Sequence, residues 1–122
     1  MEYQFGFERL KVWKEARTLN VNVYNLTKTF PREETFGITN QLRRASLSIG
    51  LNIAEGSGRK TPKDQARMYN VAYGSLMEVL AGLIMAHDLN YLPSEEINSL
   101  KRSIAKIGNQ LNALSKAINT ND

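Results

Sequence analysis

Hydrophobic residues recur at the three- and four-residue spacing of a helix in two long segments of this chain. The apolar positions of the first segment are Val12, Ala16, Leu19, Val23, Leu26 and Phe30. Those of the second are Ile97, Leu100, Ile104, Ile107, Leu111, Leu114 and Ile118. Only a helix places each set on one side. The pattern therefore predicts helices over about 9–29 and 94–118.

The segment 38–56 predicts a helix with two apolar faces. One face carries Ile38, Leu42, Ala45, Ile49 and Ile53, and the other carries Leu47, Leu51 and Ala54. The core of a single bundle covers only one of these faces, so the other needs a second partner. We therefore expect Leu47, Leu51 and Ala54 to lie in a contact between subunits.

Turn and capping residues set the remaining boundaries. Pro31 ends the first helix, and the glycines of GSG at 56–58, which tolerate positive φ, are expected to end the second. Thr61 followed by Pro62 predicts the N-cap and first position of a third helix over 62–89. Ser94 is expected to cap the fourth helix.

Four helices joined by short connections predict an all-α fold in one domain, 1–122. The expected arrangement is an antiparallel up-down-up-down four-helix bundle. The most apolar stretch, Val71 to Leu89, is long enough to raise the question of a membrane span. Because it carries Glu78, His87 and Asp88, we interpret it as a buried helix instead. The last four residues, NTND, are expected to be frayed.

The composition indicates a compartment and a class of partner. The chain has no cysteine, and its N-terminus, MEYQFGFERLKVW, lacks the order of a signal peptide, so we expect a cytoplasmic protein. The net charge of +4 comes entirely from residues 1–61, which hold ten Lys and Arg against six Asp and Glu. Such an excess permits attraction to nucleic acid or to another acidic partner.

Three groups of basic residues are candidate phosphate contacts. They are Lys11, Lys14 and Arg17 on the outer face of the first helix, Arg43 and Arg44 in the second, and Arg59, Lys60, Lys63 and Arg67 around the turn into the third. The alternative for the first group is a solvated helix face. The turn combines positive charge with the donors of a helix N-terminus, although the Asp64 carboxylate can compete for those donors.

Glu55 bears on the role of the two adjacent arginines. One of Arg43 and Arg44 is expected to point inward in a structural pair, and the other to remain a candidate for nucleic acid. Glu55 lies about three turns beyond them in the helix. We therefore expect any ion pair of Glu55 to involve another helix or subunit.

The residues that could support catalysis or metal binding are expected to have structural roles instead. His87 is the only histidine, and Ile84 stands where a Glu-x-x-His motif needs its glutamate, so packing or capping is expected. No GxxxxGK[ST] spacing occurs, and no cofactor, metal or enzyme activity is expected. Tyr69, Tyr73 and Trp13 are expected to pack in the core or in an interface rather than to stack on bases, and Glu78 to pair within the bundle.

Three segments of the sequence resemble the 23S rRNA intervening-sequence proteins, a family of four-helix bundles. These are FERLKVWKEAR, FPREETFGITNQLRRASLSIGLNIAEGSGR and GSLMEVL, and the resemblance spans about Phe7 to Ile118. One departure is Leu51, where relatives usually carry a small or polar residue. The resemblance implies a homo-oligomer, typically a five-subunit ring with a central channel, an affinity for RNA or DNA and no established enzyme activity.

The residues and the resemblance together favour a non-enzymatic oligomer that binds nucleic acid through phosphate contacts. Accessory proteins of diversity-generating retroelements are related to this family and bind both nucleic acid and a reverse transcriptase. The alternative is therefore a protein scaffold that docks onto an enzyme such as a reverse transcriptase.

Overall fold

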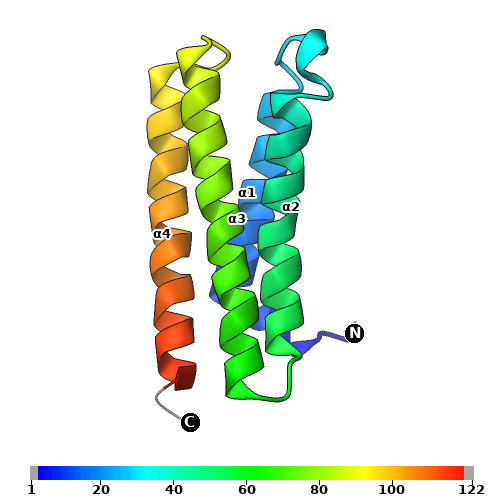
Figure 1. Cartoon of the computed structure of the whole chain (residues 1–122), viewed down its shortest axis with the longest axis vertical. Helices are drawn as coiled ribbons and strands as arrows, with labels where there is room; N and C mark the ends of the chain where they lie inside the picture. Colours follow the sequence, from blue (N-terminus) through cyan, green and yellow to red (C-terminus); the bar gives the residue numbers. More distant parts are fainter. Residues whose placement is uncertain (1–2, 120–122) are drawn as a thin grey trace.

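The computed structural model describes residues 3–119, which form four α-helices and two short 3-10 helices, with no strand among these residues (Figure 1). The elements are η1 (Gly6–Arg9), α1 (Lys11–Thr27), η2 (Arg32–Glu34), α2 (Ile38–Ser57), α3 (Pro62–Asp88) and α4 (Ser94–Asn119). Each α-helix begins and ends within two residues of its predicted bounds. Residues 120–122, part of the segment predicted to fray, lie outside the described residues.

The four helices surround one core that the hydrophobic pattern predicts. α1 and α3 each pack against both α2 and α4. All six residues of the first stripe are buried, five of them in α1 and Phe30 just after it, as are Leu42, Ala45, Ile49 and Ile53 of α2. In α4 the stripe is buried from Ile97 to Leu111, while Leu114 and Ile118 are half-buried. The residues predicted to face the core therefore do so.

α3 contributes the most apolar sequence of the four helices. By length and composition alone it could cross a membrane, a test that the core helix of a bundle also passes. Its buried residues include Tyr69, Leu76, Val79 and Leu83, all within the core. Glu78 lies on the exposed side of the helix. The predicted pairing of Glu78 within the bundle is therefore wrong, because this carboxylate stays in water and needs no buried partner.

Each end of the bundle is built from segments far apart in the sequence. At one end, here called the α2–α3 end, Phe5, Leu10, Gly58 and Ile118 line one pocket. At the other, the α3–α4 end, the Tyr91 hydroxyl donates to Glu34 Oε2 over 2.8 Å. The ring of Phe30 packs against Tyr91 there, with 5.3 Å between ring centroids.

Two predicted helix boundaries have a different local cause. α2 stops at Gly58 without positive φ, since Gly58 has φ −92° and no glycine of residues 3–119 has positive φ. Ser94 is the first residue of α4 and not its cap, because Pro93 O accepts from Ile97 N, as a cap carbonyl does. The Ser94 hydroxyl instead lies 3.1 Å from His87 Nε2.

Gly56 is required by close packing where α2 meets the start of α3. A Cβ at Gly56 would lie 2.7 Å from Tyr69 Cε1 and 3.1 Å from Met68 Cβ, whereas a Cβ at Gly74 would meet nothing within 4 Å. We expect Gly56→Ala to lower the free energy of unfolding by about 1–3 kcal/mol through overpacking. Gly74→Ala, on an exposed position of α3, should raise it by about 0.5–1 kcal/mol. Urea denaturation measures both, and equal gains for the two variants would contradict the packing argument.

Candidate nucleic-acid interface

The basic residues at the start of α1 form an exposed strip. Lys11, Lys14 and Arg17 are all exposed. The Arg17 guanidinium lies over the Trp13 ring, 5.3 Å from its centroid, and Trp13 itself packs against the core. This contact holds Arg17 along the helix while leaving its N–H groups to solvent. The strip therefore lies on the outer face of the helix, as predicted.

Arg43 joins α1 to α2 and is the arginine that points inward. Its Nε donates to Thr27 Oγ1 over 2.8 Å, and its Nη2 donates to the Tyr24 carbonyl over 3.2 Å. The guanidinium also lies 4.8 Å from the Tyr24 ring centroid. The carbonyls of the last turn of a helix lack intrahelical partners and attract a cation. Arg43 therefore caps the end of α1, and Arg44, which is exposed, keeps its side chain in solvent.

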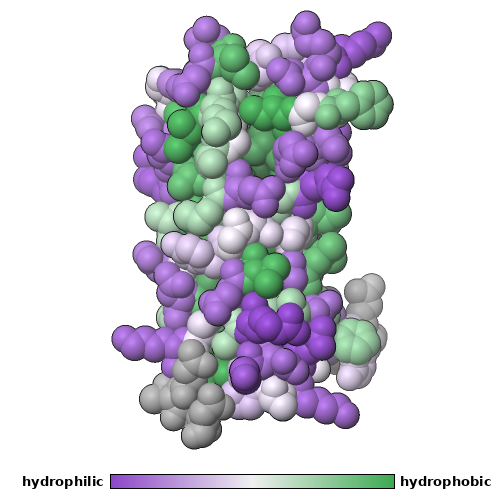
Figure 2. All heavy atoms as spheres, viewed as in Figure 1, coloured by the Kyte–Doolittle hydropathy of each residue, from purple (hydrophilic) through white to green (hydrophobic). Residues whose placement is uncertain are grey.

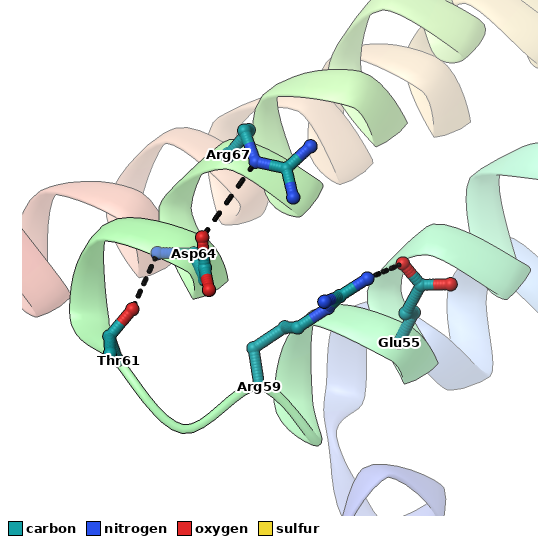
Figure 3. Close-up of polar contacts among 5 residues, drawn as sticks. All are labelled: Glu55, Arg59, Thr61, Asp64 and Arg67. Atoms are coloured by element: carbon teal, nitrogen blue, oxygen red, sulfur yellow. Dashed lines mark hydrogen bonds and ion pairs between the residues drawn. The ribbon is translucent and has the colours of Figure 1, made fainter.

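The expectation that Glu55 pairs with another helix or subunit is wrong. Glu55 Oε2 accepts from Arg59 Nη2 over 2.7 Å, four residues along the chain (Figure 3). The chain continues its helical course through Gly58, so Arg59 follows Glu55 by about one turn. The hydrogen bond to Glu55 raises the pKa of Arg59. Since both side chains are about half exposed, the pair contributes little to stability.

The turn into α3 offers fewer free donors than a bare helix N-terminus. Thr61 Oγ1 accepts from the Asp64 N–H over 3.1 Å, as the predicted cap requires, and Thr61 O accepts from the Gln65 N–H. Pro62 has no N–H to offer. Figure 3 shows the Asp64 carboxylate turned toward Arg67, with 3.9 Å between Asp64 Oδ1 and Arg67 Nε. The side chains, more than the backbone, therefore supply the positive charge here.

Two of the predicted basic groups lie at the same end of the bundle, the α2–α3 end. η1 packs against both α1 and α2, which brings the start of α1 to the same end as the turn. Lys60 and Lys63 are exposed and make no ion pair within residues 3–119. Arg59 and Arg67 each face one carboxylate. The third group, Arg43 and Arg44, lies away from this end, because Arg43 caps the C-terminal end of α1 and Arg44 is the next residue.

Aromatic residues at the same end were missed by sequence reasoning. Tyr3 is 80% exposed and Phe5 61% exposed, and their rings meet edge to face with 5.0 Å between centroids. The sequence signal was the alternation of Tyr3, Phe5 and Phe7 immediately before the first basic residues. Tyr69 is buried, and Tyr73 and Trp13 pack half-buried against the core, so the packing role predicted for these three is confirmed.

Residues that could have supported other chemistry lie in structural contacts or apart. His87 contacts Ser94 at the start of α4, in line with a role at a helix end. Within residues 3–119, no three His, Asp or Glu side chains gather into a group that could hold a metal ion.

The predicted oligomer residues differ in how far they remain uncovered. Leu47 is 44% exposed and Leu51 60% exposed, whereas Ala54 is half-buried and lines the pocket at the α2–α3 end. Figure 2 shows hydrophobic residues exposed among hydrophilic ones on the side where α2 and α3 face the viewer. The second apolar face of α2 is therefore left uncovered by the rest of the chain at Leu47 and Leu51.

Comparison with known proteins identifies the family of this bundle. Residues 8–113 match the family described as 23S rRNA-intervening sequence protein. The chain belongs to this family. A crystal structure from the S23 ribosomal protein family of Bacteroides thetaiotaomicron, of a protein with unknown function, has the same fold with a TM-score of 0.80. It is 24% identical, and the match covers 86% of this chain and 95% of that one. A search of curated proteins finds no match to this chain.

Proposed function

We propose that this protein is a non-enzymatic homo-oligomer that binds RNA or DNA through phosphate contacts at its α2–α3 end. The observation that carries the proposal is the gathering of exposed cations there, in particular Lys11, Lys14, Lys60 and Lys63. The name of the family, which relates it to an intervening sequence of 23S rRNA, points in the same direction. Phosphate contacts of this kind position a nucleic acid without reading its sequence.

The proposed subunit is an up-down-up-down bundle, and five copies form a ring in the cytoplasm. The short connections 58–61 and 89–93 support the antiparallel order, since short links join neighbouring antiparallel helices. The exposed Leu47 and Leu51 support association, and the resemblance noted above supports five subunits. Repetition around a ring multiplies a weak phosphate patch into useful affinity.

The proposal predicts binding that depends strongly on salt. Each phosphate that a lysine neutralises releases condensed counterions, so the logarithm of the association constant falls linearly with the logarithm of the salt concentration. The slope is about −0.9 per phosphate contact for duplex DNA and about −0.7 for single strands. Fluorescence anisotropy of labelled RNA and DNA, titrated at several salt concentrations, measures this slope. Absence of binding at low salt, or an affinity independent of salt, would contradict the proposal.

A second candidate is a scaffold that docks onto an enzyme such as a reverse transcriptase. Phe36 favours it, because this side chain is 92% exposed in the connection between α1 and α2. Glu34 holds that connection by accepting from the Ile38 N–H over 3.3 Å and from the Tyr91 hydroxyl. Aromatic anchors of this kind are typical of protein interfaces. A purified complex that forms without nucleic acid and is lost in Phe36→Ser would favour the scaffold.

A further inference from the structure

An apolar pocket opens at the same end of the bundle as the exposed cations. Its volume is about 570 Å³, and four separate segments of the chain form it. Phe5, Phe7 and Leu10 contribute from the N-terminal segment, Tyr69 from α3, and Leu114 and Ile118 from α4. The walls are therefore largely apolar and partly aromatic, at the end of the bundle that carries the exposed Lys11, Lys60 and Lys63.

Polar groups in the pocket are few and mostly engaged. Gln65 Nε2 donates to the Arg59 carbonyl over 2.9 Å, and Ser57 Oγ donates to the Ala54 carbonyl over 3.0 Å. These contacts fix the side chains of Gln65 and Ser57 and leave the Gln65 carbonyl oxygen as an acceptor. Such a pocket suits a flat, largely apolar group with a polar edge better than it suits a charged one.

Several residues next to the pocket lining in the chain are basic, and one carboxylate lies beside them, because the Phe5 N–H donates to Glu8 Oε2 over 2.8 Å. Gly58 lines the pocket, and Arg59 and Lys60 follow directly in the chain. Leu10 also lines it and is followed by Lys11. Phe5 is part of the wall, and the exposed ring of Tyr3 packs edge to face against the ring of Phe5. A ligand matching this arrangement carries negative charge next to an apolar planar group.

We propose that the pocket receives an unpaired nucleobase of a single-stranded nucleic acid, which stacks on Phe5 while Lys60 and Lys11 hold the adjoining phosphates. The inference rests on the proposed function and adds to it a class of ligand. Aromatic side chains in a basic groove bind bases in this way with little regard to sequence, because every base has a π-face. In a duplex the base faces are covered by stacking, so single strands bind more tightly.

Binding of matched oligonucleotides tests this assignment. The probes are single strands of RNA and of DNA, a DNA strand of equal length with abasic sites in place of its bases, and a duplex. Phe5→Ala should weaken binding of the base-containing single strands by about 5- to 150-fold, which is the usual effect of removing one stacked base. Binding of the abasic strand and of the duplex should not change. Phe36→Ala, which removes an exposed aromatic at the other end, is the matched control and should leave every affinity unchanged.

The outcomes separate this inference from the proposed function. Equal affinity for abasic and base-containing strands, or no effect of Phe5→Ala, overturns the nucleobase site while salt-dependent phosphate binding still stands. No binding of any strand at low salt overturns both. If Phe5→Ala instead changes the sedimentation coefficient and the affinity for all strands equally, a second copy of the chain occupies the pocket, and the inference is overturned. Phe5 is 61% exposed, so thermal melting should confirm that the variant is folded.

Discussion

The double variant Leu47→Gln/Leu51→Gln is expected to sediment as a single folded subunit, whereas the unchanged protein is expected to sediment as the proposed oligomer. Both side chains are exposed in the subunit, at 44% and 60%, so their replacement should change its free energy of unfolding by no more than about 0.5 kcal/mol. In an interface each leucine contributes roughly 1.5–3 kcal/mol, and a buried amide would also have to lose its water. Sedimentation velocity measures the change directly.

Loss of the oligomer should also weaken nucleic-acid binding. Subunits in a ring present several basic patches to one strand, and this multivalency is worth about 10²–10⁴-fold in affinity. The matched control is Val21→Gln, which changes a residue of α1 that is 53% exposed. It should leave both sedimentation and binding unchanged. An unchanged protein that sediments as a monomer at working concentration, or a double variant that remains oligomeric, would show that α2 does not form the subunit contact.

The core could be predicted from sequence because the buried residues of a helix recur at helical spacing within a single segment of the chain. The α1 stripe from Val12 to Leu26 is an example, since helical geometry alone decides which residues share a side. Boundaries set by a capping side chain were also predictable, as at Thr61. At Ser94 the same signal failed, because the hydroxyl has a tertiary partner in His87 and the Pro93 carbonyl starts the helix.

The candidate site was less predictable because its contacts depend on where helices end and on which ends meet. The Glu55 and Arg59 pair follows from α2 continuing its helical course past residue 56. The sequence predicted that one of Arg43 and Arg44 points inward, but not which one. The partners of Arg43 are a carbonyl and a hydroxyl of α1, which no sequence pattern marks. The pocket beside Phe5 requires four segments to meet, and no spacing within one segment records that meeting.

Neutralising the two lysines of the turn should remove a large part of the salt dependence of binding. Lys60 and Lys63 are exposed and, within residues 3–119, have no carboxylate partner, so they are the cations most available to phosphate. We expect the variant Lys60→Gln/Lys63→Gln to lower the logarithmic salt slope for single strands by about 1.4 for each subunit that contacts the strand, or about 0.7 per lysine. The measurement is anisotropy over a range of salt concentrations.

The variant Lys101→Gln/Arg102→Gln is the control that makes this result interpretable. It removes the same net charge from two exposed positions on the first half of α4, away from the α2–α3 end. If binding depends on contacts at the turn, this control should keep nearly the full slope, because charges farther away than about 8 Å are largely screened at physiological salt. If both variants lowered the slope equally, the net charge of the protein and not the α2–α3 end would govern the attraction. Retention of both slopes would place the phosphate contacts on other residues, with Arg44 and Arg17 the next to be tested.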